Sequence, residues 1–154
     1  MTTRIGLVSD SHDTFCKDWP SVLATLTDAF AGVDAILHCG DISTVSVLDA
    51  LTGIAPVHAT RSEGDPPADP PRLQDGPVVV DIGGHRIGLA FSRPAGFDDV
   101  EVVVFGGTHA ASIEDVDGIP WVNPGSPSLA EQRTVAVLTL APGASPTAEI
   151  VALP

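Results

Sequence analysis

Two short apolar runs, each ending in a carboxylate, constrain this chain more than any other feature. The first stretch is Ile5–His12, in which the apolar residues give way to Asp10 and His12. The second is Ala35–Asp41, which ends in Gly40 and Asp41. Apolar runs of this length, bounded by polar residues, are typical of strands buried on both faces. In open α/β sheets, the loops that follow such strands hold the functional sites.

A helix is predicted between the two runs, because apolar residues recur there at helical spacing and Asp18 and Pro20 supply a start signal. Strand, helix and strand then form a right-handed crossover, so both strands end at the same edge of the sheet. Asp41 is therefore expected beside Asp10 and His12, and neighbouring carboxylates repel each other unless a cation lies between them. The Asp10–His12 pair alone has a plainer interpretation, a capping acid beside an exposed imidazole. The helical apolar positions are Trp19, Val22, Leu23, Leu26 and Phe30.

The rest of the chain indicates a single α/β domain over residues 1–154, with two layers of β-sheet and helices on the outer face of the first. A short helix is expected over Val45–Leu51, beginning near Ser43, and a strand over Ala55–Ala59. The proline-rich segment 66–71 is expected to be a loop joining the two halves of the domain. Strands dominate the second half; they are expected over 78–82, 86–91, 100–105, 113–116, 120–122, 134–140 and 148–153.

Charge and composition exclude several classes of function. The formal net charge is −13 with 7 lysines and arginines, which leaves almost no basic surface for a nucleic acid. No apolar run is long enough to cross a membrane, and no secretory signal is recognisable, so a cytoplasmic location is expected. Cys16 and Cys39 form neither a disulfide framework nor a zinc motif, and Cys39 is expected to pack as a small apolar residue.

Four motifs in order give the chain its resemblance to a known family. They are Asp10-x-His12, Gly40-Asp41, Gly106-x-Thr108-His109 and the turn 123–128, Asn-Pro-Gly-Ser-Pro-Ser. In this order the chain resembles the calcineurin-like metallophosphoesterases, specifically their small bacterial and archaeal phosphodiesterase branch. The resemblance implies a four-layer fold, a β-sandwich flanked by helices, and a two-metal site that hydrolyses phosphate esters.

The resemblance implies one intact metal site and one degraded site. The first metal would be held by Asp10, His12, Asp41 and His109, all of which match the family pattern. At the second site, Glu63 stands in place of an asparagine but is still able to bind a cation. Phe91 and Gly107 stand in place of two histidines and are not. One divalent ion, Mn, Fe, Ni or Zn, is therefore expected, with the second pocket vacant. The helix that usually precedes the segment matching Gly106-x-Thr108-His109 is also absent, since only residues 94–99 are left to join that segment to Phe91–Arg93.

Arg93 lies near the emptied position in the sequence. A guanidinium there is expected to pair with Asp41 or Glu63, or to clamp a phosphate, and the alternative is an ordinary exposed arginine. The favoured hypothesis is a metal-dependent phosphodiesterase of reduced activity, with Asp41 and Arg93 as catalytic residues and a small phosphate ester as substrate. The other hypothesis is an inactive scaffold that binds a protein partner of unknown identity. The resemblance offers a precedent, since a eukaryotic retromer subunit of this fold works as a scaffold. A homo-oligomer is compatible with both.

Overall fold

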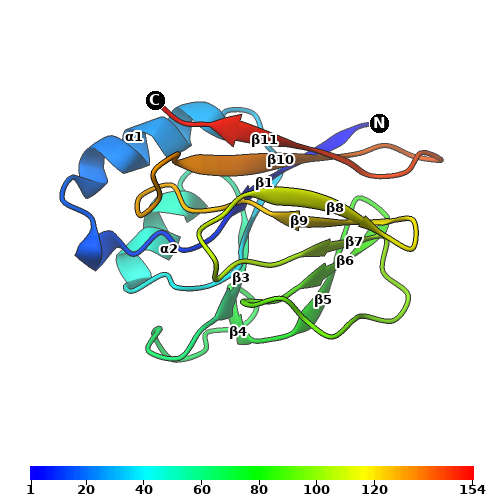
Figure 1. Ribbon diagram of the computed structural model, residues 1–154, viewed down its shortest axis with the longest axis horizontal. Helices are drawn as coiled ribbons and strands as arrows, with labels where there is room; N and C mark the ends of the chain where they lie inside the picture. The colour runs from blue at the N-terminus through cyan, green and yellow to red at the C-terminus, as the bar shows by residue number, and fades with distance from the viewer.

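The protein, described here by a computed structural model of residues 1–154, consists of two packed β-sheets and two α-helices (Figure 1). Strands β1, β2, β3 and β4 of the first sheet are parallel, and β10 and β11 extend it antiparallel beyond β1. The order across this sheet is β11-β10-β1-β2-β3-β4. Its strands are β1 (Thr3–Val8), β2 (Ala35–His38), β3 (Val57–Arg61), β4 (Leu73–Asp75), β10 (Thr134–Leu140) and β11 (Thr147–Ala152).

The second sheet has the order β5-β6-β7-β9-β8. Hairpins β5–β6 and β8–β9 are antiparallel, whereas β7 runs parallel to both β6 and β9. Its strands are β5 (Val78–Ile82), β6 (His85–Leu89), β7 (Val102–Val104), β8 (Ser112–Val116) and β9 (Ile119–Asn123). The strands expected over 78–82 and 86–91, and over 113–116 and 120–122, therefore pair as these two hairpins.

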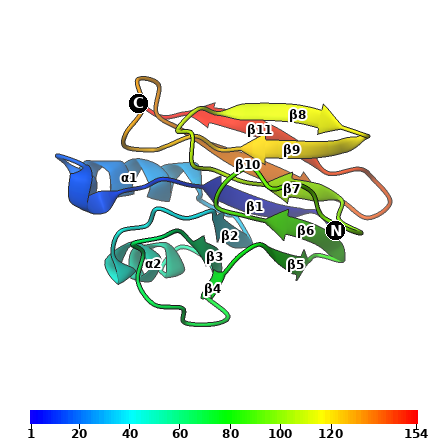
Figure 2. The ribbon, with the colours of Figure 1, turned by 60° about the horizontal axis from the view of Figure 1, so that its bottom comes forward.

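Helices α1 (Trp19–Ala29) and α2 (Val45–Thr52) cover the outer face of the first sheet, as expected (Figure 2). One core lies between these helices and the first sheet, and a second core lies between the two sheets. The outer face of the second sheet carries no helix; a small cluster that includes Phe105 and Trp121 packs there instead. The two sheets flanked by helices are confirmed, but the fourth layer implied by the family resemblance is missing.

Burial on both faces explains why β1 and β2 read as continuous apolar runs. Ile5 and Leu7 of β1 face the second sheet, and Leu37 of β2 packs beside them. On the opposite face, Gly6 lets the Phe30 ring of α1 lie directly against the strand, since an added Cβ would be 2.7 Å from that ring. Strands covered in this way have fixed ends, and those ends position the loops that follow.

Several boundaries differ from the sequence-based expectation. The third strand is β3 and lies two residues later than expected, and β4 was not expected at all. Residues 66–71 form a loop, but the chain passes from the first sheet to the second only at Gly76 and Pro77, after β4. Asp13–Phe15 forms one turn of 3₁₀ helix, labelled η1. No helix in the protein is long and apolar enough to cross a membrane.

Candidate metal centre

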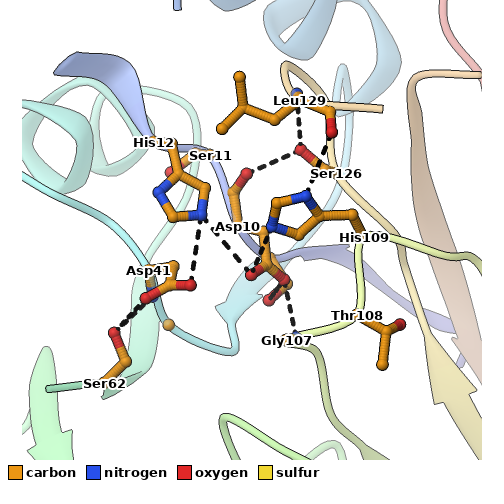
Figure 3. Close-up of polar contacts among 12 residues, drawn as sticks. Asp10, Ser11, His12, Asp41, Ser62, Gly107, Thr108, His109, Ser126 and Leu129 are labelled. Carbon is orange, nitrogen blue, oxygen red and sulfur yellow. Dashed lines mark hydrogen bonds and ion pairs between the residues drawn. The ribbon is translucent and has the colours of Figure 1, made fainter. Parts of the chain in front are cut away.

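The structure brings Asp10, His12, Asp41 and His109 together in one group (Figure 3). Asp10 and His12 lie in the loop after β1, Asp41 in the loop after β2, and His109 in the loop after β7. Backbone hydrogen bonds from Asp10 N to Gly40 O (2.9 Å) and from His12 N to Asp41 O (3.1 Å) join the first two loops. The convergence predicted from the sequence is therefore found. That these residues bind a metal stays a prediction.

The distances in this group suit a small metal ion. His12 Nε2 lies 3.2 Å from Asp41 Oδ2 and 3.8 Å from Asp10 Oδ1, and His109 Nε2 lies 3.4 Å from Asp10 Oδ1. Metal bonds of about 2.0–2.1 Å place tetrahedral ligand atoms about 3.4 Å apart. Asp10 Oδ1 and His12 Nε2 are buried and have no hydrogen-bond partner. Unpartnered buried polar atoms are rare, and a cation between them would satisfy both.

The orientation of His109 is fixed from outside the group. Its Nδ1 lies 3.1 Å from the carbonyl oxygen of Leu129, so Nδ1 carries the proton and donates it there. The lone pair of Nε2 therefore faces Asp10. Metal-binding histidines are usually held in this way by a backbone carbonyl.

All four residues of the group adopt left-handed backbone conformations, with φ of 55° at Asp10, 42° at His12, 56° at Asp41 and 64° at His109. Only seven residues other than glycine have positive φ in the whole chain, and four of them are these. Such conformations are uncommon outside glycine and cluster at functional sites, where the surrounding structure holds them. The strained backbone conformations therefore lie at the four residues whose side-chain directions determine whether a metal ion can be bound.

Asp41 is held by residues that the sequence analysis did not single out. The Ser62 hydroxyl donates to Asp41 Oδ1. The Asp65 carboxylate accepts hydrogen bonds from the backbone N–H groups of Asp41, Ile42, Ser43 and Ser62 at 2.9–3.1 Å. Asp41 thus presents Oδ2 to His12 while Oδ1 is engaged by Ser62. The Ser-x-x-Asp spacing of Ser62 and Asp65 is typical of a side-chain-stabilised turn and was the available signal.

The turn at 123–128 packs under the group. Ser126 Oγ donates to the Asp10 carbonyl at 2.8 Å, and Ser128 Oγ donates to the Ser11 carbonyl. The Asn123 amide contacts no member of the group; its Nδ2 donates to Thr108 Oγ1 at 3.0 Å. This turn therefore anchors both the Asp10 loop and the loop that carries His109.

The Phe91 side chain packs where the second metal pocket of the family pattern is expected. The Phe91 ring lies against Gly40, where an added Cβ would be 2.7 Å from Phe91 Cδ1, and against Gly107, at 3.6 Å from Cζ. The ring thus occupies the space next to Asp41 between the two glycines. The phenyl group that replaces a histidine therefore takes up volume beside Asp41, and the absence of a second ion stays a prediction.

Glu63 and Arg93 do not join the group. The Glu63 side chain is exposed and is not among the converging ligands. Both arms of the Arg93 guanidinium donate to Glu114 at 3.0 Å, and its Cζ lies 4.9 Å from the Trp121 ring centroid. The expected pairing of Arg93 with Asp41 or Glu63 was wrong, because the residue turns to the outer face of the second sheet.

Arg93→Ala is therefore expected to act on stability and not on catalysis. The substitution removes a half-exposed ion pair and a stacking contact, which together are worth about 1 kcal/mol of unfolding free energy. Urea unfolding measures that loss, while kcat of the metal-loaded protein should match wild type. A drop in kcat of tenfold or more would restore Arg93 to the catalytic role predicted from the sequence.

Burial sets the protonation of the groups beneath the centre. Removal from water raises the pKa of Asp10, against the hydrogen bonds from Ser9 and Gly107 that lower it. The pKa of the Cys39 thiol is also raised by burial, then by the nearby Asp10 charge, which makes it an unreactive core residue, as expected. Burial lowers the pKa of His38 to about 4. Neutral His38 accepts from Gly40 N at Nδ1 and contacts Ser11 Oγ through Nε2, so it links the two ligand-bearing loops.

The pKa of His38 predicts acid sensitivity of the fold. The unfolded chain takes up a proton near the ordinary pKa of 6.5, but folded His38 resists it down to about 4. The stability contributed by neutral His38 is therefore complete at neutral pH and falls by about 2 kcal/mol at pH 5. The raised pKa of Asp10 has the opposite effect, because it makes the fold more stable as the pH falls. Wild type and His38→Gln share this effect, so the two proteins are compared in chelator. The loss of stability between pH 7 and pH 5 should shrink by that amount in the variant; an unchanged loss would contradict the assignment.

Residues 3–143 match the family model described as the calcineurin-like phosphoesterase superfamily domain. The chain belongs to the calcineurin-like phosphoesterase superfamily. A probable metallophosphoesterase of Methanocaldococcus jannaschii is 32% identical over 139 residues, covering 83% of this chain and 70% of that protein.

Solved structures show the same superfamily fold. An archaeal phosphodiesterase superposes with a TM-score of 0.78 at 20% identity, covering 98% of this chain and 100% of that one. Vacuolar protein sorting 29 of Cryptosporidium parvum superposes with a TM-score of 0.75 at 18% identity, covering 98% and 97%. Metal-dependent hydrolysis is thus a property of this superfamily, and the four-residue group is the candidate metal site of this member.

Proposed function

We propose that the protein is a phosphodiesterase that works with one divalent transition-metal ion. The observation that carries the proposal is the convergence of one ligand atom from each of four residues, all within 4.8 Å of one another: Asp10, His12, Asp41 and His109. Two candidate ligand atoms, Asp10 Oδ1 and His12 Nε2, are buried and have no hydrogen-bond partner. Mixed carboxylate and imidazole ligands suit Mn, Fe, Ni or Zn. A bound ion supplies Lewis acidity towards a phosphoryl oxygen and activates water at neutral pH.

The residues of the chain provide the rest of what hydrolysis needs. Asp10 is fully buried and held by Ser9 and Gly107, so it forms the fixed floor of the centre. Asp41 and His109 are partly exposed, at 24% and 33% of their side chains, and they open the centre to a substrate. The reaction adds water across one P–O ester bond and yields a phosphomonoester and an alcohol.

A single ion is proposed because the contacts on the other side of Asp41 leave no second set of ligands. Oδ1 of Asp41 is taken by the Ser62 hydroxyl, and Phe91 fills the space between Gly40 and Gly107. With one ion, a single cation opposes the charge that develops in the transition state. One lost electrostatic contact is typically worth about 3–4 kcal/mol, so activity about 10²–10³-fold below that of two-metal relatives is expected.

Hydrolysis of bis(4-nitrophenyl) phosphate during metal titration tests the proposal. Turnover should rise with added Mn²⁺ and level off at one ion per chain, and Asp41→Ala should lack it. The matched control is Asp98→Ala, which removes an exposed carboxylate elsewhere. A plateau at two ions would refute the single-ion form, and metal-independent turnover would refute the metal centre.

The second candidate function is an inactive scaffold. The filling of the second pocket by Phe91 favours it, and the structural similarity to vacuolar protein sorting 29 shows that the fold is not confined to proteins named as phosphodiesterases. A scaffold would show no phosphodiester turnover with or without metal, whereas the enzyme would turn over once loaded. The retention of four converging ligands favours the enzyme.

A further inference from the structure

A groove of about 520 Å³ runs beside the metal centre, between the start of α1 and the loop before β10. It is referred to here as the Phe15 groove. Its principal lining residues are Phe15, Lys17, Asp18, Ser128, Leu129 and Arg133.

The Phe15 groove and the metal centre share their walls. The Phe15 ring stands edge-on to the His12 imidazole, with centroids 5.9 Å apart. Leu129, on the opposite wall, accepts the hydrogen bond that orients His109 (Figure 3). A ligand whose phosphate lay at His12 and His109 would therefore be close enough to reach the Phe15 ring.

Phe15 is exposed to an unusual degree. Its side chain is 72% accessible, whereas Phe30 and Phe105 are buried and Phe91 and Phe97 are half-buried. The ring belongs to none of the apolar clusters of the core. A free phenyl face next to a phosphate-binding centre is suited to stacking on a planar aromatic ring such as a nucleobase.

The charges in the Phe15 groove are the second observation. Of the seven lysines and arginines, four are paired with carboxylates: Arg61, Arg72, Arg86 and Arg93. Two of the remaining three, Lys17 and Arg133, line this groove. Arg133 donates to the backbone oxygen of Pro154, and the one groove carboxylate, Asp18, accepts from Ser21 at the start of α1. In a protein of net charge −13, two cations that lie in one groove and pair with no carboxylate side chain indicate an anionic ligand.

We propose that the substrate is a nucleotide phosphodiester, whose base stacks on Phe15 and whose next phosphate is bound by Lys17 and Arg133. The proposal rests on the phosphodiesterase function of the adjacent centre. Scission then takes place at the metal centre, while the groove selects esters that carry an aromatic ring and a further negative charge.

Binding of three product-like ligands to the Mn²⁺-loaded protein tests the groove without requiring turnover. Methyl phosphate offers a phosphate alone, thymidine 5′-monophosphate adds the base, and thymidine 3′,5′-bisphosphate adds the second charge. Calorimetry should give a Kd that falls at each step, by about 5- to 30-fold for the base. A flat series would overturn the proposal.

Variants assign each step to its residue. Phe15→Ala should abolish the gain in affinity that the base provides and leave the gain from the second phosphate. Lys17→Ala or Arg133→Ala should do the reverse, abolishing only the gain in affinity that the second phosphate provides. Arg4→Ala is the matched control, since Arg4 lies at the far end of β1 and, like Lys17 and Arg133, pairs with no carboxylate side chain. Equal losses for all three ligands in Phe15→Ala, or an effect of Arg4→Ala as large as that of Arg133→Ala, would contradict the assignment. Failure of the phosphodiesterase function appears separately, as absent hydrolysis of bis(4-nitrophenyl) phosphate.

Discussion

Asp10→Asn should abolish metal binding and at the same time make the metal-free protein more stable than wild type. Asparagine keeps an oxygen that accepts from Ser9 Oγ (2.6 Å) and Gly107 N (2.9 Å). It replaces the unpartnered buried Oδ1 by an amide that donates towards His109 Nε2, 3.4 Å away. The substitution gives the buried position a hydrogen-bond partner and removes a carboxyl group whose pKa is raised by burial. Together these effects should raise the free energy of unfolding of the metal-free protein by about 1–2 kcal/mol.

The measurement is a pair of thermal melts for each protein, one in chelator and one in excess Mn²⁺. In chelator the variant should melt about 3–6 °C above wild type. At metal concentrations about 100-fold above Kd, wild type should gain about 3 kcal/mol and become the more stable of the two, while the variant does not respond. Asp98→Asn, an exposed change of equal charge, should respond to metal as wild type does. If Asp10→Asn were less stable in chelator, the apo carboxylate would not be the unfavourable group inferred here.

Gly106→Ala should both destabilise the fold and remove the metal centre. A methyl group at this position would overlap the Ser9 hydroxyl and lie 2.9 Å from Asp10 Oδ2. Both side chains are fully buried and have no room to move aside. Overpacking of a closed core typically costs about 1–3 kcal/mol, which lowers the melting temperature of a domain this size by about 3–10 °C.

The control is Gly96→Ala, because an added Cβ there has no neighbour within 4 Å. That variant should fold, melt and bind metal as wild type does. Gly106→Ala should instead bind Mn²⁺ at least about tenfold more weakly, since Asp10 must turn away from its partners. Wild-type affinity in Gly106→Ala would show that Asp10 is not held between the β1 and β7 loops as described.

The sequence predicted those features that depend on strand ends. Each of three ligand residues follows a buried strand: Asp10, Asp41 and His109. Because β1 and β2 are parallel and the other strands pair in fixed order, the ends of these strands determine where the three residues meet. Strand β4 was missed because it has only three residues after a proline-rich loop and is formed by its pairing with β3. A strand that short carries no periodic signal of its own.

The region of the expected second metal pocket depends on the directions of the Phe91 and Arg93 side chains, which no local sequence pattern specifies. Phe91 was correctly recognised as unable to bind a metal, but its packing between Gly40 and Gly107 depends on two loops from different sheets. Arg93 follows two residues later and points to Glu114 on β8, a residue 21 positions away. Tertiary contacts therefore decided what the resemblance left open.

One metal ion is proposed to bind between four residues: Asp10, His12, Asp41 and His109. Anomalous diffraction from crystals grown with Mn²⁺ would locate such an ion. We expect a single strong peak that lies about 2.0–2.3 Å from each of four atoms: Asp10 Oδ1, His12 Nε2, Asp41 Oδ2 and His109 Nε2. A second peak beside Phe91, or no peak among these four atoms, would contradict it.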